Sequence, residues 1–457
     1  MDSDKKYTMD MCHGPLFSKV LRFSIPLILS NLAALLFHAV DLVVLGQFTS
    51  SDDMAAVGAT YGFIVLMLNV FWGIAAGVNV LTARYIGAKE PEKVVKTVHT
   101  SIAIAFLGGI IMGIISFLLT DFVLHLMATP EKIMDKARVY MQISCAGVPF
   151  IIFYSFGSAI LRAVGDTKRP LIYMCIAGVV NVLLNMFFIL VLKMSVAGVA
   201  IATQTAHFIS AYLVIRALVK SDGDYKLVWK KIRMDWKSTK EILQIGIPAG
   251  FQGSMFTVTN IGIQATINTF GPDVIAGNTA ALNLEGLIYA VCYSFYLASI
   301  SFTGQNHGGK QYKRIIKSIF ICIACSAAAV IFLSWGFILA GKQLLAIYNP
   351  EPEVIKWGLL RMKMVFSLYF LCALMDIISG SLRGLGHSLK PAIVIVFGVC
   401  VFRIVWIFTV FRKSPTLETL FTAYPVSWLL ICIINGVMLY IICRRMLIRA
   451  SKRQFCE

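Results

Sequence analysis

The amino-acid sequence predicts an all-α, polytopic membrane protein with twelve transmembrane helices. Of its 457 residues, 58% are hydrophobic and only 14% are charged, whereas about a quarter of the residues in soluble domains are charged. The hydrophobic residues occur in blocks of roughly twenty or more, the length that a helix needs to cross a hydrocarbon core of about 30 Å. Polar and apolar residues do not alternate within the blocks, so a transmembrane β-barrel is not expected.

The predicted spans follow one another with short polar connections. We place them at residues 16–44, 55–82, 97–120, 137–160, 170–192, 195–218, 241–268, 275–305, 316–340, 357–382, 391–411 and 417–445. Residues 1–15 are polar, and the first apolar block is too long for the hydrophobic region of a signal peptide, so we expect no cleavable signal.

The net charge of +18 follows the topology. Basic residues cluster at alternate ends of the spans, whereas the opposite loops, such as Ser50–Asp53 and Pro350–Glu353, are acidic or nearly uncharged. This positive-inside asymmetry places both termini in the cytoplasm. Because no basic domain lies outside the spans, nucleic acid is not an expected partner. The Cys322–Cys325 pair lacks a second pair or nearby histidines, so no metal site is expected.

An internal duplication divides the chain. Leu161–Pro170 and Leu382–Pro391 share leucine, arginine, glycine and proline at matching positions, at a shift of 221 residues. The same shift aligns the Gly-Ala-Lys that ends at Lys89 with the Gly-Gly-Lys that ends at Lys310. A shift of 222 aligns Pro26 with Pro248 at the starts of the first and seventh spans.

The duplication defines the predicted domains. These are a cytoplasmic tail (1–15), an N-lobe with six spans (16–218), a basic linker (219–240), a C-lobe with six spans (241–445) and a basic cytoplasmic tail (446–457). An even number of spans per lobe gives both lobes the same orientation, an arrangement in which rocking about a cavity alternates access. The duplication therefore favours a transporter over a repeat that serves stability alone.

Several motifs together resemble the prokaryotic branch of the multidrug and toxic compound extrusion (MATE) family. They are Ser24–Leu27, Val40–Gly46, Ile86–Ala88, the paired Leu-Arg-x-x-Gly segments and Ser301–Asn306. The resemblance extends over residues 15–450. It implies two six-helix lobes that form a V, and export of drugs or cations driven by sodium or proton entry across a bacterial cell membrane, without a cofactor. It also implies a monomer.

Asp41, late in the first span, is the main candidate for ion coupling. A charged side chain costs about 2.5–3.5 kcal/mol at membrane depth, so its presence indicates a function. His38 lies three residues earlier, on the same helical face and within reach of the carboxylate. The alternative is a hydrogen-bonded helix-end residue for Asp41 and a packing residue for His38.

The resemblance implies an N-lobe ion site in which Asp41 is joined by polar residues of spans five and six. The matching positions are Asn181, Asn185 and Thr203. Many relatives carry an aspartate where this chain has Asn185, so a two-carboxylate proton relay is not expected. The oxygens of these three side chains suit sodium as well as a proton path. The alternative is hydrogen bonding that joins the helices.

The predicted C-lobe carries its own charges within spans. Asp376 and Arg403 are predicted to pair across neighbouring helices, because an unpaired buried arginine would be costly. Glu285, which follows Asn283, has no obvious partner and is the second candidate carboxylate. The seventh-span glutamate of some relatives is absent, since Phe256 occupies the corresponding place.

Two further groups of residues have predicted roles. Pro26 removes a backbone hydrogen bond and is a hinge candidate, with simple structural kinking as the alternative. Polarizable and aromatic side chains are candidates to line a cavity for flat organic cations. They are Met255, Phe256, Tyr289, Tyr293 and Tyr296.

The sequence thus predicts secondary active efflux of small amphiphilic, cationic organic compounds in antiport with sodium or protons, with membrane lipid as its surroundings. No phosphate-binding GxxxxGK[ST] loop is present, so neither ATP hydrolysis nor another enzymatic activity is expected. A lipid or oligosaccharide-lipid flippase is the first alternative, although it needs a strongly cationic cavity and only Arg403 is expected at membrane depth. A passive channel is the second.

Overall fold

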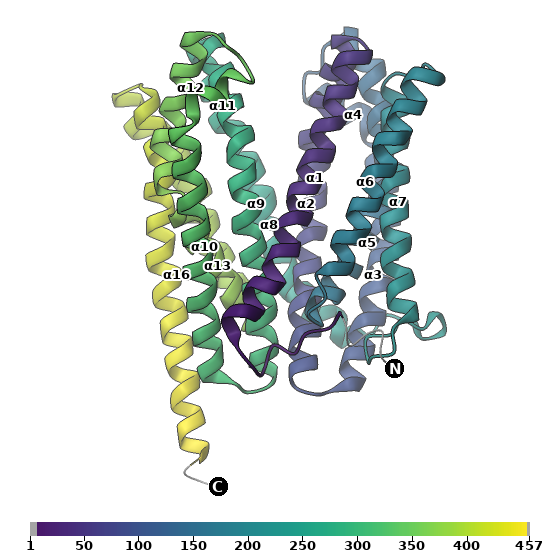
Figure 1. Ribbon diagram of the computed structural model, residues 1–457, viewed down its shortest axis with the longest axis vertical. Coiled ribbons are helices and arrows are strands. Elements are labelled where there is room, and N and C mark those ends of the chain that lie inside the picture. The colour runs from purple at the N-terminus through teal and green to yellow at the C-terminus, as the bar shows by residue number, and fades with distance from the viewer. Residues whose placement is uncertain (1–6, 455–457) are drawn as a thin grey trace. The chain divides into compact units, whose positions relative to one another are not determined.

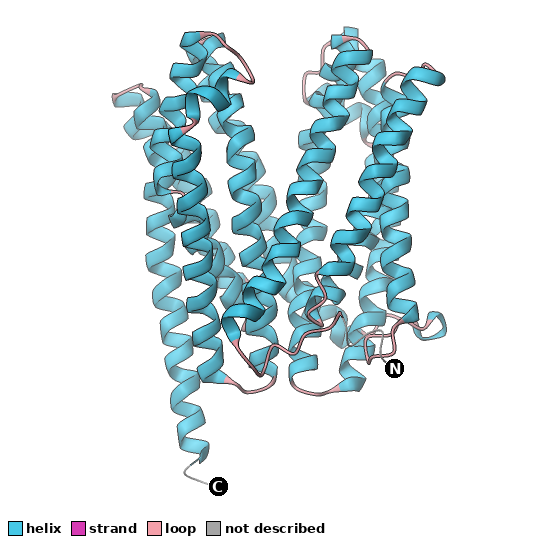
Figure 2. Cartoon of the chain, in the orientation of Figure 1, coloured by secondary structure: helices cyan, strands magenta, loops and turns pink. Residues whose placement is uncertain are grey.

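A computed structural model describes residues 7–454, with side chains described through residue 451, and every regular element in that range is a helix (Figure 2). The first half holds α1 (Leu16–Phe48), α2 (Ser51–Gly87), α3 (Pro91–Leu118), α4 (Thr120–Leu126), α5 (Glu131–Ala163), α6 (Lys168–Met186), η1 (Phe187–Val191) and α7 (Val196–Lys220) (Figure 1). The predicted all-α class is confirmed.

The second half repeats this order after η2 (Trp229–Lys231). It holds α8 (Trp236–Ile267), η3 (Asn268–Phe270), α9 (Pro272–Gly308), α10 (Tyr312–Leu339), α11 (Gly341–Ala346), α12 (Pro352–Val365), η4 (Phe366–Leu368), α13 (Phe370–Gly384), α14 (Leu389–Ile395), η5 (Val396–Val401), α15 (Phe402–Trp406), η6 (Ile407–Phe411) and α16 (Leu417–Gln454).

Most of these helices are long and apolar enough to cross a membrane. Within the described residues, ten helical stretches satisfy both criteria, and two of them, Lys168–Val191 and Leu389–Phe411, join consecutive elements. Pro352–Leu368 and Phe370–Gly384, bent by 46°, make an eleventh when they are counted as one span. The remaining long helix, α8, has 32 residues. The protein is therefore a multi-pass membrane protein.

The duplication extends to backbone detail. Helices α2, α3 and α7 begin 221 residues before α9, α10 and α16. Lys89 and Lys310, at the turns after α2 and α9, have φ of 56° and 55°, and Gly165 and Gly386 both have φ of 90°. Positive φ is uncommon for residues other than glycine, so the shared value at the two lysines indicates the same turn in both halves.

The described chain forms two compact units, and the division does not fall in the linker. The first unit contains residues 7–10 and Leu29–Gly250, and the second contains Met11–Ile28 and residues 251–454. The division cuts α1 and α8, in each case two residues after a proline, Pro26 or Pro248.

Within the first unit, the beginning of α8 packs against α2 at backbone distance. A Cβ atom added to Gly73 would overlap the backbone N of Gly250, and one added to Gly246 would lie 2.5 Å from Cα of Ile74. Gly77 lies one turn beyond Gly73 and is similarly close to α8. Small residues four apart on both helices allow this approach, as in other membrane helix pairs.

Candidate functional site

Four polar side chains meet inside the first unit, around Asp41 of α1. Asn185 of α6 donates from Nδ2 to Asp41 Oδ1 at 2.5 Å, and Thr203 of α7 donates from Oγ1 to Asp41 Oδ2 at 3.1 Å. Asn181 of α6 donates to Thr203 Oγ1 at 3.2 Å and accepts from Asn185 Nδ2 at 3.3 Å. The structure therefore brings together the four residues that the family resemblance groups into one site.

The local sequence explains why these groups meet. Asn181 and Asn185 are four residues apart on α6, so they lie one above the other on the same helical face. Only 6% of Asp41 and 0% of Asn185 is exposed. Among the described residues, no hydrogen-bond partner reaches the buried Asn185 Oδ1. A buried unsatisfied acceptor is costly, and this oxygen has unused capacity to accept.

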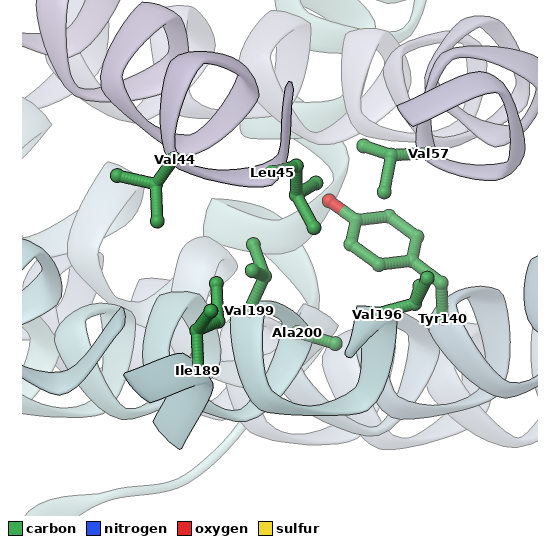
Figure 3. Packing of buried hydrophobic residues seen from close by; sticks show 8 residues of the cluster. All are labelled: Val44, Leu45, Val57, Tyr140, Ile189, Val196, Val199 and Ala200. Atoms are coloured by element: carbon green, nitrogen blue, oxygen red, sulfur yellow. The ribbon is translucent and has the colours of Figure 1, made fainter. Parts of the chain in front are cut away.

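A hydrophobic cluster closes one side of the site. It contains Val44, Leu45, Val57, Tyr140, Ile189, Val196, Val199 and Ala200 (Figure 3). Leu45, Ile189 and Val199 each lie four residues along their helix from Asp41, Asn185 and Thr203 respectively, which is one helical turn. The apolar turn beyond each polar residue excludes water from this side and strengthens the electrostatic interactions inside.

Within the described residues, His38 does not take part in the hydrogen-bond network around Asp41. Its ring stacks on the ring of Tyr61 of α2, with 4.6 Å between centroids. The described side chains show no hydrogen bond between His38 and Asp41, although the two residues are close in sequence. The stack on Tyr61 fits the packing alternative for His38, and a coupling role for this histidine stays a prediction.

The second unit contains an ion pair that was not predicted from the sequence. Arg361 of α12 donates from NH2 to Glu285 Oε2 of α9 at 2.6 Å and from NH1 to Asn278 Oδ1 at 2.8 Å. Tyr369 donates to the other carboxylate oxygen of Glu285 at 3.3 Å. Asn283 is exposed on α9 and lies outside this network. Arg361 stands within a predicted span, so the rule that selected Arg403 would also have found it.

Asp376 and Arg403 do not form the predicted ion pair. Arg403, of which 3% is exposed, donates from Nε to Ser427 Oγ at 3.1 Å and lies over the ring of Tyr424 at 4.1 Å. Its NH2 and Asp376 Oδ2 are both buried and have no hydrogen-bond partner within the part of the chain that the structure describes. The prediction is wrong because the aromatic side chains of α16, Tyr424 and Trp428, surround the guanidinium.

The three tyrosines among the predicted cavity-lining residues form a row along α9. Tyr289 and Tyr293 stack with 6.2 Å between ring centroids, and Tyr293 and Tyr296 stack with 5.5 Å. Arg383 donates to the Tyr296 hydroxyl and, at 2.5 Å, to Gln252 Oε1 of α8. Arg383 belongs to the repeated Leu-Arg-x-x-Gly segment, so the repeat was the signal for this buried group.

Two other predicted residues lie on α8 next to Gln252. Met255 and Phe256 are partly buried in the second unit. Their side chains stay candidates for substrate contact. Pro26 lies inside α1, as the sequence predicts.

Comparison with known proteins agrees with the duplicated fold. The family model described as MatE matches the chain twice, at residues 26–187 and again at 248–409, which reproduces the shift of 222. A probable multidrug resistance protein, YpnP of Bacillus subtilis (strain 168), is 26% identical over 399 residues that cover 86% of this chain and 88% of that protein. An FAD transporter of Shewanella oneidensis is 21% identical, over 75% of this chain and 77% of that protein.

Solved structures have the same fold. The structure described as "Crystal structure of MATE in the bent conformation" has a TM-score of 0.89 at 18% identity, and the match covers 96% of this chain and 98% of that one. The two matched segments of the family model comprise well over half of the sequence. The chain belongs to the MatE family, the MATE transporters, and is a transporter and not an enzyme.

Proposed function

We propose that this transporter exports small amphiphilic organic compounds, cationic ones among them, in antiport with sodium ions or protons that bind at Asp41. The observation that carries the proposal is the buried carboxylate of Asp41, to which Asn185 and Thr203 donate. MATE transporters couple export to an ion gradient, and a buried ionisable residue in a span is the group that such coupling needs. The multidrug names of the relatives support the substrate class.

The contacts of Asp41 suit either ion. A sodium ion prefers oxygen ligands, and the site offers the Asp41 carboxylate, the Thr203 hydroxyl and the amide oxygens of Asn181 and Asn185. A proton on Asp41 Oδ2 would instead donate to Thr203 Oγ1, which has free acceptor capacity because a hydroxyl both donates and accepts. In both cases the bound cation neutralises the carboxylate and changes the hydrogen bonds between α1, α6 and α7.

Pro26 supports a mechanical link from this site to the transport cycle. A proline inside a helix removes one backbone hydrogen bond and allows a bend. Pro26 lies two residues before the point at which α1 passes from the second unit to the first. We propose that α1 bends at Pro26 when the charge on Asp41 changes.

The flippase alternative receives less support. Arg361 and Arg383 are buried as well as Arg403, so the expectation of a single arginine at membrane depth is wrong. However, Arg361 pairs with Glu285, Arg383 donates to Gln252 and Tyr296, and Arg403 donates to Ser427. All three guanidinium groups thus have side-chain partners within the protein, which does not suit a pyrophosphate cavity.

Uptake of a cationic dye into inverted membrane vesicles tests the proposal, because export from the cell corresponds to transport into the lumen of such vesicles. The dye is added outside, a sodium or a proton gradient directed out of the lumen is imposed separately, and the wild type is compared with Asp41→Asn. We expect the variant to reach the membrane and to lose gradient-driven transport, because a neutral amide cannot bind and release the coupling cation as a carboxylate does. The wild type's response to one gradient and not the other identifies the coupling ion.

Three matched variants complete the experiment. Asp121→Asn removes a carboxylate that is exposed and paired with Arg138, so transport should remain. Glu285→Gln and Asp376→Asn test the second unit, where Asp376 Oδ2 has no hydrogen-bond partner among residues 7–451. Undiminished gradient-driven transport by Asp41→Asn, with loss in one of these two variants, would move the coupling site to the second unit. Flux that ignores both gradients would indicate a passive channel.

We further propose that the protein acts as a monomer, with both termini in the cytoplasm of a bacterial cell.

A further inference from the structure

An apolar groove runs along the second unit between α10 and α16, and Ile378 of α13 forms part of its floor. Its volume is about 500 Å³. The lining residues are Ile316, Ile319, Phe320, Ile323, Ile378, Gly436, Leu439, Tyr440, Cys443, Arg444 and Leu447. Among these lining residues, Arg444 alone carries a charge. We refer to this feature as the α10–α16 groove; the three helices lie alongside one another in Figure 1.

The length of the groove matches half of a bilayer. Its α16 wall extends from Gly436 to Leu447, about 17 Å at a rise of 1.5 Å per residue. One leaflet of a hydrocarbon core of about 30 Å is about 15 Å thick. Gly436 leaves the inner end open, because a Cβ atom there would meet only Ile378 Cδ1, at 3.9 Å. The groove therefore accommodates an extended acyl chain of one leaflet.

The opposite end of the groove, away from Gly436, is strongly basic. Arg444 is exposed there, and its side chain makes no ion pair among the described residues. Lys313 and Lys317, in the first two turns of α10, are exposed at the same end of the antiparallel helix pair. Helix α10 has no acidic residue, and the acidic residue of α16 is Glu418, at the opposite end of that helix.

We propose that the α10–α16 groove binds an anionic phospholipid, with one acyl chain in the groove and the headgroup phosphate at Arg444. The apolar walls pack closely around the acyl chain and stabilise it through dispersion contacts. The guanidinium of Arg444 donates to phosphate oxygens in its fork geometry. Positive-inside asymmetry assigns this basic end to the cytoplasmic leaflet, where anionic lipids attract Lys and Arg. The inference is independent of the proposed coupling ion and substrate.

Native mass spectrometry of the full-length protein, released from detergent, tests the proposal directly. The purified protein is incubated with phosphatidylglycerol or with phosphatidylcholine of the same acyl chains. We expect one phosphatidylglycerol to be retained per chain, with about five-fold weaker retention of phosphatidylcholine, the ratio expected from one basic side chain. Equal retention of the two lipids would overturn the proposal, as would a dimer that holds no lipid.

Two variants with matched controls locate the binding site. Gly436→Leu fills the open end of the groove, and Arg444→Gln removes the headgroup contact; we expect the first to lose the retained lipid and the second to lose only the preference for phosphatidylglycerol. The controls are Gly336→Leu on α10, where a Cβ atom meets nothing within 4 Å, and Arg445→Gln next to Arg444. Lipid retention that is unchanged in Gly436→Leu, or reduced equally in variants and controls, would overturn the assignment to this groove.

Discussion

Arg403 lies over the ring of Tyr424, with 4.1 Å between Cζ and the ring centroid, at the repeat positions of Asn181 and Thr203. The two segments matched by the family model, 26–187 and 248–409, are offset by 222, an offset that pairs Asn181 with Arg403. The starts of α7 and α16 are offset by 221, which pairs Thr203 with Tyr424. Each pair is in contact within its own unit.

The two halves thus have a contact between corresponding helices, but the chemistry of that contact differs. In the first unit, two neutral hydrogen-bonding groups serve the Asp41 carboxylate. In the second unit, a guanidinium lies against aromatic rings, and the positions that correspond to Asp41 are occupied by Gly262 or Ile263. This asymmetry supports an assignment of ion coupling to the first unit, and it predicts different behaviour for equivalent substitutions.

Asn185→Asp should change how the transporter responds to pH. It would place a second carboxylate where Nδ2 now lies 2.5 Å from Asp41 Oδ1, and two like charges at this distance hold one proton between them. We expect dye uptake into inverted vesicles to become steeply dependent on the proton gradient and less responsive to sodium. Asn185→Gln serves as a control without charge. A pH profile in Asn185→Asp identical to that of the wild type would contradict the geometry.

Loss of one partner of the buried ion pair Glu285–Arg361 should cost more stability than replacement of both partners together. Removing one partner of a buried pair costs about 3–5 kcal/mol because the other charge is left uncompensated. We therefore expect Glu285→Gln to lower the thermal unfolding temperature strongly, and Glu285→Gln combined with Arg361→Met to recover part of that loss. The exposed pair of Glu353 and Lys356 is the control, with about 0–1 kcal/mol. Additive losses at Glu285 and Arg361 would show that the pair contributes nothing as a unit.

The contact of α2 with α8 should not tolerate a methyl group. Gly73→Ala places Cβ against the backbone N of Gly250, and backbone cannot move aside as a flexible side chain can. We expect a loss of about 1–3 kcal/mol in unfolding free energy, measured by thermal unfolding in detergent. Gly62→Ala on the same helix meets nothing within 4 Å and should be neutral or slightly stabilising, because alanine favours helix. Equal stability of the two variants would contradict the close approach.

Asp235 should stabilise the protein in a pH-dependent manner. It precedes α8 and accepts at Oδ2 from the backbone N and the hydroxyl of Ser238, both at 2.8 Å, and these hydrogen bonds lower the pKa of Asp235 below its ordinary value of 3.8. A lowered pKa means that the stabilisation is present above pH 3.8 and is lost as the pH falls through the pKa of the folded state. We expect Asp235→Ala to cost about 1 kcal/mol at pH 7.

The thermal unfolding temperatures of Asp235→Ala and the wild type should therefore converge as the pH is lowered below 3.8. Asp224→Ala, in the same linker, removes an exposed carboxylate and should follow the wild type at every pH. A difference between Asp235→Ala and the wild type that persists in acid would indicate that the carboxylate does not act as a charged helix cap.

The sequence predicted the helical fold and its duplication because both depend on regular patterns. Apolar blocks fix the spans, and repeated glycine, proline and arginine residues at a constant shift fix the two halves. The polar residues around Asp41 were also identified, through the family resemblance and not through spacing. That α1, α6 and α7 converge on one point is a property of tertiary packing, which periodicity does not contain.

The side-chain partners were predicted less well. His38 stands one turn from Asp41 along the helix, yet a ring on α2 holds it, and sequence distance says nothing about such a neighbour. Arg403 was assigned a carboxylate on a neighbouring span, whereas the structure gives it aromatic rings. Glu285 lacked a partner because Arg361 was overlooked. In each case, the missing information was which face of one helix meets which face of another.

The matching left-handed turns at Lys89 and Lys310 place the same backbone conformation twice within one molecule. A lysine in this conformation is strained by roughly 1–2 kcal/mol relative to glycine, and the two φ values differ by a single degree. Exchange of either lysine for glycine should therefore relieve the same strain in two places that share a backbone but differ in surroundings. The difference between the two changes in unfolding free energy would report how the surroundings of the turn differ between the two halves since the duplication.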